Sequence, residues 1–338
     1  MSEPYYRLIP DVIAAAVEKA GMIPTARMNP MNSYENRVYD VALDDGSHIV
    51  IKFYRPERWS REQIQEEHDF IKELDGDEIP VCVPLAMPDG STVGEIESFY
   101  FAIWPRTGGR VPDELSDTDL ASLGMLIARL HNVGSVKSSA HRIALTAEHY
   151  GIVPFDFLVK NKFLPASCIA QYGDAVRNAV DTYNERVRDV PLIRIHGDCH
   201  YGNFLTRDDR WHVLDFDDFV MGPAVQDIWM LTSGEGAEGE RRRRIFLGGY
   251  RTFREFDESW LSLIEPLRAL RYINYAGWIA KRWNDPMFPR YFPHFGTTEY
   301  WVKETADLVD QVAKFSAQPI TDDETAKPTK KDYFWDMD

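Results

Sequence analysis

Two short segments, HGDCHYGN at 196–203 and LDFDD at 214–218, most strongly limit what this chain can fold into. Asp198 precedes Asn203 by five positions, and Asp215 follows Asn203 by twelve. Apolar residues flank these polar ones, and the charged run RDDR lies between the two segments. The pattern predicts a loop, a strand, a turn and a second strand. Such a hairpin would bring the three polar side chains together.

These three side chains could take complementary roles in one reaction. Asn203 and Asp215 could hold Mg²⁺, which takes one or two hard oxygen ligands from a protein and the rest from phosphates and water. Asp198 could then orient or deprotonate a hydroxyl group. An Asp and an Asn five positions apart are weak evidence alone, because turns contain both residues for their local hydrogen bonds.

The upstream part of the chain supplies a basic group and an acidic helix. Two β-rich runs, 34–43 and 47–54, are separated by Asp-Asp-Gly, a strong hairpin signal, and Lys52 lies in the second run. The next segment, 60–74, begins with a Ser cap and a Gln three positions later, and its apolar residues recur at helical spacing. The order of these parts supports a catalytic site more strongly than any single motif.

The remaining segments predict a two-lobed α+β protein. We expect an opening helix over 9–20 and further strands over 81–87 and 98–104, followed by the Pro- and Gly-rich stretch PRTGGR. Beyond it, helical periodicity dominates, in 117–134 and within 170–189, 240–256 and 259–284. Because single cores stop growing at roughly 250 to 300 residues, the 338 residues predict an N-terminal lobe (1–105), a C-terminal lobe (106–316) and a polar tail (317–338).

Charge and cysteine content narrow the possible partners and location. Lys and Arg total 38 against 54 Asp and Glu, a net charge of −16, which repels nucleic acids and anionic lipid surfaces. The three cysteines are too few and too widely spaced for a disulfide framework. No run of about 18 apolar residues is present. We therefore expect a cytoplasmic monomer that binds neither nucleic acid nor membrane.

The two segments at 196–218 also match a known catalytic pattern. Protein kinases carry His-Arg-Asp, four residues and Asn, followed by a metal-binding Asp in Asp-Phe-Gly. Here Gly197 replaces the Arg and Asp217 replaces the Gly, which is typical of the aminoglycoside and choline kinase branch. Together with IVIKFYRP, FAIWPRTGGR, DFDDFVMGPAVQDIWML and NYAGWIAKRW, these motifs make most of the chain resemble the bacterial stress response kinase A family.

The resemblance implies a fold and an activity. The fold would be α+β and protein-kinase-like, of the aminoglycoside phosphotransferase type, with a small sheet-containing N-terminal lobe and a larger helical C-terminal lobe. The activity would be that of a stress-response Ser/Thr protein kinase that uses ATP and Mg²⁺. The acceptor is therefore expected to be a protein hydroxyl, with a small hydroxyl compound, of aminoglycoside, choline or homoserine type, as the alternative.

Residue by residue, the resemblance makes Asp198 the catalytic base, and Asn203 and Asp215 the Mg²⁺ ligands, with Asp215 also counted as catalytic. Lys52 would reach the α- and β-phosphates of ATP. An acidic side chain must hold its flexible stem, and Glu67 is our choice, with Glu66 as its rival.

No Gly-rich phosphate loop is present at the expected place, where the chain reads MNSYENRVY. Backbone N–H groups and small polar side chains must then cover the phosphates, and Ser33 with Asn32 are the expected donors. Adenine should meet the backbone near Ile103 and Trp104, before Pro105.

Other functions remain open at this stage. DFDD and GPAVQD are separated by only a few residues, too few for the activation segment of ordinary protein kinases. This shortness weakens peptide docking of the ordinary kind and keeps the small-molecule alternative open. A metal-dependent hydrolase could use His196, Asp198, His200 and Asp215 as ligands, but it leaves Lys52 unexplained. An inactive ATP-binding module would need a lost catalytic group, and none is missing.

Three neighbouring residues have expected supporting roles. His196 should brace the loop by bonding backbone or Asp215. Asp217 is either a second metal contact or a structural hydrogen-bonding group. Asp227, at the start of a helix, is expected to bond the catalytic loop.

Overall fold

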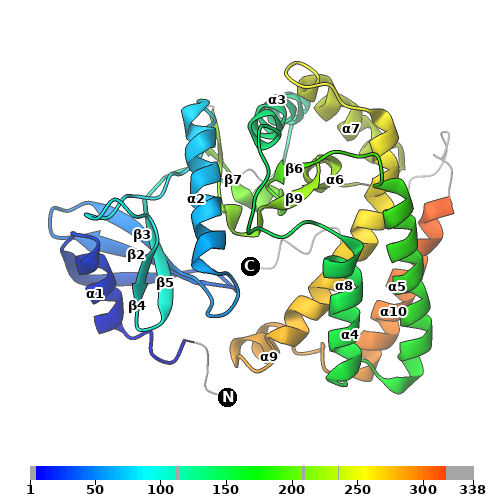
Figure 1. Ribbon diagram of the computed structural model, residues 1–338, viewed down its shortest axis with the longest axis horizontal. Coiled ribbons are helices and arrows are strands. Elements are labelled where there is room, and N and C mark those ends of the chain that lie inside the picture. Colours follow the sequence, from blue (N-terminus) through cyan, green and yellow to red (C-terminus); the bar gives the residue numbers. More distant parts are fainter. Residues whose placement is uncertain (1–4, 112–113, 208–209, 235, 317–338) are drawn as a thin grey trace.

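The computed structural model describes residues 5–111, 114–207, 210–234 and 236–316. Figure 1 shows a smaller lobe built on a sheet and a larger helical lobe, with helix α2 between them. The α+β, kinase-like architecture expected from the sequence is therefore present.

The N-terminal lobe is a five-stranded antiparallel sheet with two helices. The strand order is β1-β2-β3-β5-β4. In chain order the elements are α1 (Pro10–Lys19), β1 (Pro24–Met31), β2 (Arg37–Leu43), β3 (His48–Phe53), α2 (Arg61–Gly76), β4 (Gly94–Ile96) and β5 (Phe99–Pro105).

Strand β3 places Lys52 on the sheet face opposite the main core of this lobe. Its neighbours Ile51 and Phe53 are fully buried in the cluster that also contains residues of α1. Since successive side chains of a strand alternate between the two faces, Ile51 points to the α1 side and Lys52 points to the α2 side. The sequence-predicted hairpin thus sets the direction of the lysine.

Helix α2 confirms the predicted capping box. Ser60 accepts from the Gln63 N–H, and the Gln63 side chain accepts from the Ser60 N–H. Because these bonds satisfy two of the helix's unpaired donors, they fix its first turn. Phe70 and Leu74, on its buried face, join the core of the C-terminal lobe, so α2 packs against both lobes.

The structure differs from the sequence prediction for this lobe in two places. The run 81–87 is no strand: it makes one isolated bridge, between Val81 and Val213, and Pro84 in its middle cannot donate to a sheet ladder. Strand β1 was not expected, because Pro24 and Pro30 mask its periodicity. It is an edge strand, a position where a sheet tolerates proline. The expected strands over 34–43, 47–54 and 98–104 are confirmed as β2, β3 and β5.

The C-terminal lobe is mainly helical and carries two small β-pairs. Strand β6 pairs with β9, and β7 pairs with β8. In chain order the elements are α3 (Asp117–Gly134), a π-helical turn (Glu148–Ile152), α4 (Val153–Lys160), α5 (Ala166–Arg186), β6 (Leu192–Ile195), β7 (Phe204–Arg207), β8 (Arg210–Val213), β9 (Val220–Pro223), α6 (Val225–Leu231), α7 (Gly236–Tyr250), α8 (Ile264–Lys281), α9 (Met287–Tyr291) and α10 (Thr298–Ala313).

Helix α8 crosses this lobe and ends beside α9, on the side that faces the sheet (Figure 1). The aromatic segment 283–295 contains the short helix α9, and both Phe288 and Phe295 are buried. Within the described ranges, no helix is both long and apolar enough to cross a membrane. The lobe boundary at 105 stays a prediction, and the polar tail lies outside the described residues.

Candidate active site

The loop after β6, which carries the predicted base Asp198, is held by Asp227 of α6. The Asp227 carboxylate accepts from the His196 N–H at 2.8 Å and from the Gly197 N–H at 2.9 Å, and it lies 3.0 Å from Nε2 of buried His131. His196 Nε2 lies 2.8 Å from the Leu214 carbonyl oxygen. The expected bracing by His196 and Asp227 is therefore present, and it ties the loop to the segment that carries Asp215.

Gly197 stands where protein kinases have arginine, and the backbone conformation explains why this position holds glycine. Gly197 has a φ of +83°, a conformation that L side chains rarely adopt, and a Cβ there would collide with the Asp218 carbonyl oxygen. The turn before Asp198 therefore requires glycine.

The β7–β8 hairpin brings the two expected metal ligands to its open end. Phe204 pairs with Val213, and the Leu214 N–H donates to the Asn203 carbonyl at 2.9 Å. Asn203 Nδ2 donates to the Asp198 carbonyl at 2.8 Å, so its amide oxygen is the atom that can coordinate a cation. Asp215 adopts a left-handed conformation, with φ of 54°, and its side chain is 56% exposed.

Asp198 is held between two basic groups. Its Oδ1 lies 2.7 Å from an Arg271 guanidinium nitrogen, and its Oδ2 lies 3.4 Å from His200 Nε2. Burial opposes ionisation of the carboxyl, but Arg271 and His200 outweigh burial and hold the pKa of Asp198 well below its usual range. Asp198 is therefore ionised at neutral pH, as a hydroxyl-orienting group must be.

Lys52 lies among three carboxylates. Its Nζ is 3.1 Å from Asp215, 3.1 Å from Asp217 and 3.9 Å from Glu67. Burial disfavours the charged amine, but these carboxylates outweigh burial and raise the pKa of Lys52 well above its usual value. The lysine is thus a cation placed beside Asp215, where it can also meet phosphate oxygens.

Glu66, the rival partner for Lys52, has a different contact. Its carboxylate accepts from the backbone N–H groups of Ala140, His141 and Arg142, at 2.6 to 3.1 Å. Glu66 thereby fastens the segment after α3 to helix α2, and Glu67 is the acidic residue of this helix that faces Lys52.

Arg142 links helix α2 to the segment that follows Asp215. Its fully buried guanidinium donates to Glu67 at 2.9 Å and to the Asp217 carbonyl at 2.7 Å, while its Nε donates to the Gln63 carbonyl at 3.0 Å. A planar guanidinium can hold several acceptors in a fixed geometry. Arg142 therefore fixes Glu67 relative to the Asp215 segment.

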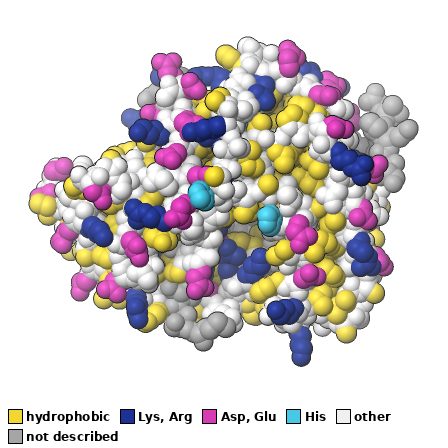
Figure 2. Space-filling model, viewed as in Figure 1, with side chains coloured by type: hydrophobic (Ala, Val, Ile, Leu, Met, Phe, Trp, Pro, Cys, Tyr) yellow, Lys and Arg dark blue, Asp and Glu magenta, His cyan; other side chains and the backbone are white. Residues whose placement is uncertain are grey.

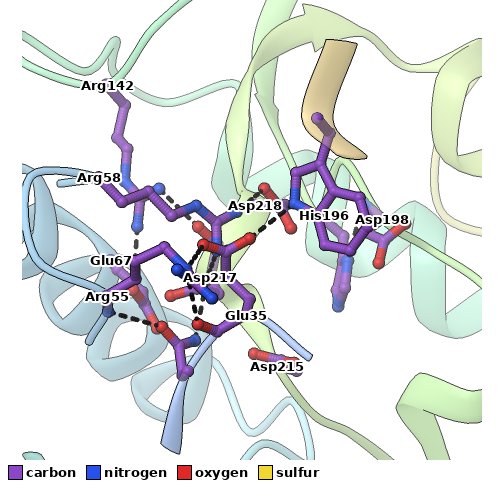
Figure 3. A network of polar contacts seen from close by, with 12 residues as sticks. Glu35, Arg55, Arg58, Glu67, Arg142, His196, Asp198, Asp215, Asp217 and Asp218 are labelled. Atoms are coloured by element: carbon purple, nitrogen blue, oxygen red, sulfur yellow. Dashed lines mark hydrogen bonds and ion pairs between the residues drawn. The ribbon is translucent and has the colours of Figure 1, made fainter. Parts of the chain in front are cut away.

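The surroundings of Asp217 are those of a structural ion pair and not those of a second metal ligand. Its carboxylate contacts Lys52, Arg58 and Asn36 from the N-terminal lobe. Figure 3 shows Asp217 among the arginines, whereas Asp198 lies beyond His196 on the other side. Of the two expected roles of Asp217, the contacts support a structural hydrogen-bonding group and not a second metal contact.

The loop between β1 and β2 lies at the expected phosphate-loop position. The Ser33 hydroxyl accepts from the Asn36 N–H at 3.3 Å. Glu35, nearby, contacts the C-terminal lobe, with its carboxylate 2.6 Å from Arg282 Nε and 2.6 Å from Trp278 Nε1. The loop thus bridges to the end of α8. Phosphate binding by Ser33 and Asn32 stays a prediction.

At the hinge, Ile103 and Trp104 face opposite sides of β5. The Ile103 side chain is 2% exposed in the core of the N-terminal lobe, and its carbonyl accepts from the Leu85 N–H at 2.7 Å. Trp104 lies on the Lys52 side, with its ring 5.8 Å from Nζ. The Ile103 carbonyl is therefore already bonded, and adenine binding near Ile103 and Trp104 stays a prediction.

The donor set fits a hard divalent cation. Asn203 and Asp215 offer one amide oxygen and one carboxylate, the small number of protein ligands that Mg²⁺ takes when phosphates and water complete its shell. Over the described part of the chain, no group of three or more His, Cys, Asp or Glu side chains could hold a metal ion. His196 and His200 are ligands in the hydrolase alternative. Here His196 Nε2 is bonded to the Leu214 carbonyl, and His200 Nδ1 accepts from the Gly202 N–H.

Sequence reasoning missed the arginines of this site. Arg58, Arg142 and Arg271 contact its acidic residues, but they lie in a loop, a connecting segment and a helix without any local motif. Their proximity to the predicted site residues arises only from the tertiary fold, so no pattern along the chain could have identified them.

Comparisons with known proteins agree with this geometry. The model of the phosphotransferase enzyme family matches residues 28–263. Stress response kinase A of Escherichia coli (strain K12) is 37% identical over 317 residues, which cover 94% of this chain and 96% of the relative. The protein named serine/threonine protein kinase RdoA, from Salmonella typhimurium, is 36% identical over the same share of each chain.

Solved structures agree in fold at low identity. The amicoumacin kinase hAmiN aligns with a TM-score of 0.68 at 20% identity, over 89% of this chain and 92% of that one. A microcompartment-associated aminopropanol kinase aligns with a TM-score of 0.66 at 18% identity, over 90% and 96% of the two chains. From the family match and the full-length relatives, the chain belongs to the phosphotransferase enzyme family and, within it, to the stress response kinase A family.

Proposed function

We propose that the chain is an ATP-dependent Ser/Thr protein kinase that acts in the bacterial stress response. Its family membership makes it a phosphotransferase. The observation that carries the proposal is the joint arrangement of an ionised Asp198, the Asn203 and Asp215 pair at the base of one hairpin, and Lys52 beside Asp215. The name of the Salmonella relative supports a protein acceptor.

The roles of the residues follow from their chemistry. The acceptor hydroxyl gives its proton to Asp198 while its oxygen forms a bond to the γ-phosphorus, and ADP leaves with the electrons of the broken P–O bond. Lys52, oriented by Glu67, contacts the phosphates, and Ser33 covers them. Mg²⁺, held by Asn203 and Asp215, supplies charge neutralisation when bound.

The test is transfer of label from γ-labelled ATP to a Ser/Thr protein substrate, comparing the wild type with Asp198→Ala. We expect the variant to lose roughly 10²- to 10⁴-fold in turnover, the usual contribution of a positioned acid or base. Asp189→Ala, at an exposed position after α5, is the control and should keep wild-type turnover. Undiminished transfer by Asp198→Ala would refute the assignment of the base.

A second candidate, a small-molecule kinase, is favoured by one observation. Strand β9 begins at Val220, two positions after Asp218, and α6 begins at Val225, so no long activation segment is available to dock a peptide. The same assay therefore includes amino alcohols and aminoglycosides, and label in these compounds alone would favour this candidate over a protein kinase.

A further inference from the structure

One face of helix α8 forms a wall beside the catalytic loop. Arg271, Tyr275, Trp278 and Arg282 follow one another at intervals of four, three and four positions, which places them on a single helix face. Arg271 contacts Asp198 at 2.7 Å, while Trp278 and Arg282 each contact Glu35 of the phosphate-side loop at 2.6 Å. This face, the α8 wall, thus extends from the expected base to the loop expected over the phosphates.

The α8 wall consists of cations and aromatic rings. The Tyr275 and Trp278 rings are stacked, with centroids 5.5 Å apart, between Arg271 and Arg282. The only acidic residue of α8 is Glu265, which lies in its first turn and pairs with Arg268 and Gln311. The wall itself therefore carries no carboxylate.

The region around Asp198 can be reached from solvent. The side chains of Asp198 and Arg271 are each 23% exposed, and that of Asp218, which follows the metal-binding segment, is 48% exposed. Figure 2 shows Lys and Arg atoms at the hollow between the two lobes, with hydrophobic atoms beside them on the larger lobe. An acceptor entering there would meet the Arg271 guanidinium and apolar surface, together with the carboxylates of Asp198 and Asp218.

This chemistry discriminates between classes of acceptor. A polycationic acceptor needs carboxylates and is opposed by a guanidinium beside the base. A guanidinium binds carboxylate or phosphate groups with directed, charge-assisted hydrogen bonds. Because it carries five N–H donors, Arg271 can hold Asp198 and contact an acceptor anion at the same time.

We propose that Arg271 determines acceptor specificity by selecting a Ser or Thr hydroxyl flanked by acidic residues, with Tyr275 and Trp278 packing against the same peptide. The inference rests on the proposed protein kinase function. The net charge of −16 does not oppose it at the site, because charges beyond about 8 Å are largely screened at physiological salt and the nearest groups dominate.

The test compares two serine peptides of equal length, one with Glu and one with Lys around the serine. We expect the wild type to prefer the acidic peptide by tenfold or more in kcat/KM, mainly through KM. Arg271→Gln should lose this preference, and Arg271→Lys, which keeps the charge, should retain part of it. Lys281→Gln removes one positive charge from an exposed position of the same helix and should keep the wild-type preference.

A binding measurement separates recognition from turnover. Fluorescence anisotropy of labelled peptides with Ala in place of Ser should give tighter binding of the acidic peptide to the wild type, and not to Arg271→Gln. A wild type that binds the basic peptide better, or an Arg271→Gln variant that slows both peptides equally without changing KM or binding, would overturn the inference.

Small acceptors distinguish this inference from the proposed function. Hydroxy acids should be compared with amino alcohols and aminoglycosides. If hydroxy acids take label through Arg271 and peptides do not, the protein kinase proposal fails while the anion selectivity of Arg271 stands. If only amino alcohols or aminoglycosides take label, both proposals fail.

Discussion

At the scale of single residues, the site depends on charged side chains that are buried and contact one another. Glu67 is 1% exposed and contacts Lys52 and Arg142. Burial raises the pKa of Glu67 to about 7, against the opposing effect of these two cations. The sequence supplied Glu67 and its rival Glu66 as candidates, but only the arrangement of the neighbouring backbone amides distinguishes them.

This raised pKa predicts a pH dependence of stability. Between the usual carboxyl value of 4.5 and about 7, the folded state binds more protons than the unfolded state, so the free energy of unfolding falls as the pH rises and levels off above about 7. Glu67→Gln should remove this contribution, roughly 1 to 3 kcal/mol across the interval. Urea unfolding of both proteins from pH 5 to pH 8 measures it, and parallel curves would contradict the prediction.

At the scale of elements, close packing of α3 and α7 supports the loop that carries Asp198. Helix α3 carries His131, which contacts Asp227 below the loop and Tyr250 of α7. A Cβ at Gly249 would collide with the Ala121 carbonyl oxygen of α3. The periodicity of the sequence predicted both helices, but it gave no sign that their backbones approach so closely.

Adjacent glycines of α7 provide a matched test of this contact. Gly249→Ala should destabilise the protein by about 1 to 3 kcal/mol or more, since the backbones must move apart. Gly248→Ala has open space around the new methyl group and should stabilise the helix by about 0.5 to 1 kcal/mol. Thermal unfolding of the two variants checks the direction of each stability change. Equal changes in stability would show that the contact between α3 and α7 at Gly249 does not stabilise the protein.

At the scale of the whole molecule, a buried ion-pair cluster joins the lobes. Glu35 of the N-terminal lobe contacts Arg282 at 2.6 Å, and Arg55 of the same lobe contacts Asp285 at 2.9 Å. Burial opposes ionisation of Glu35, but Arg58 and Arg282 outweigh burial and lower its pKa. These contacts fix the phosphate-side loop against the end of α8.

Removing the charge of Glu35 should therefore weaken the whole fold. Glu35→Gln leaves buried arginines without their carboxylate, and the loss of one member of a buried pair costs about 3 to 5 kcal/mol. Glu238→Gln removes an exposed pair with Arg241 and should cause little change. Denaturant unfolding of the two variants measures the contrast. A Glu35→Gln variant as stable as the Glu238→Gln control would mean that the cluster does not hold the lobes together.

The sequence by itself determined the parts that depend on local spacing. The hairpin with Lys52, the capped helix α2, the loop with Asp198 and Asn203, and the α+β class all follow from periodicity, turn residues and motif order, because neighbouring residues fix local structure. The same spacing carried the family resemblance. The missed β1, whose prolines hide its pattern, and the expected strand at 81–87 failed at this level.

The tertiary structure alone decided which distant charges meet. Arg58, Arg142 and Arg271 reach the acidic residues from segments that are 73 to 159 positions away, and no local rule links such positions. It also decided that Asp217 is enclosed by cations while Asp215 stays exposed. Burial and charge pairing are properties of the packed chain, since they depend on what surrounds a side chain and not on its neighbours in sequence.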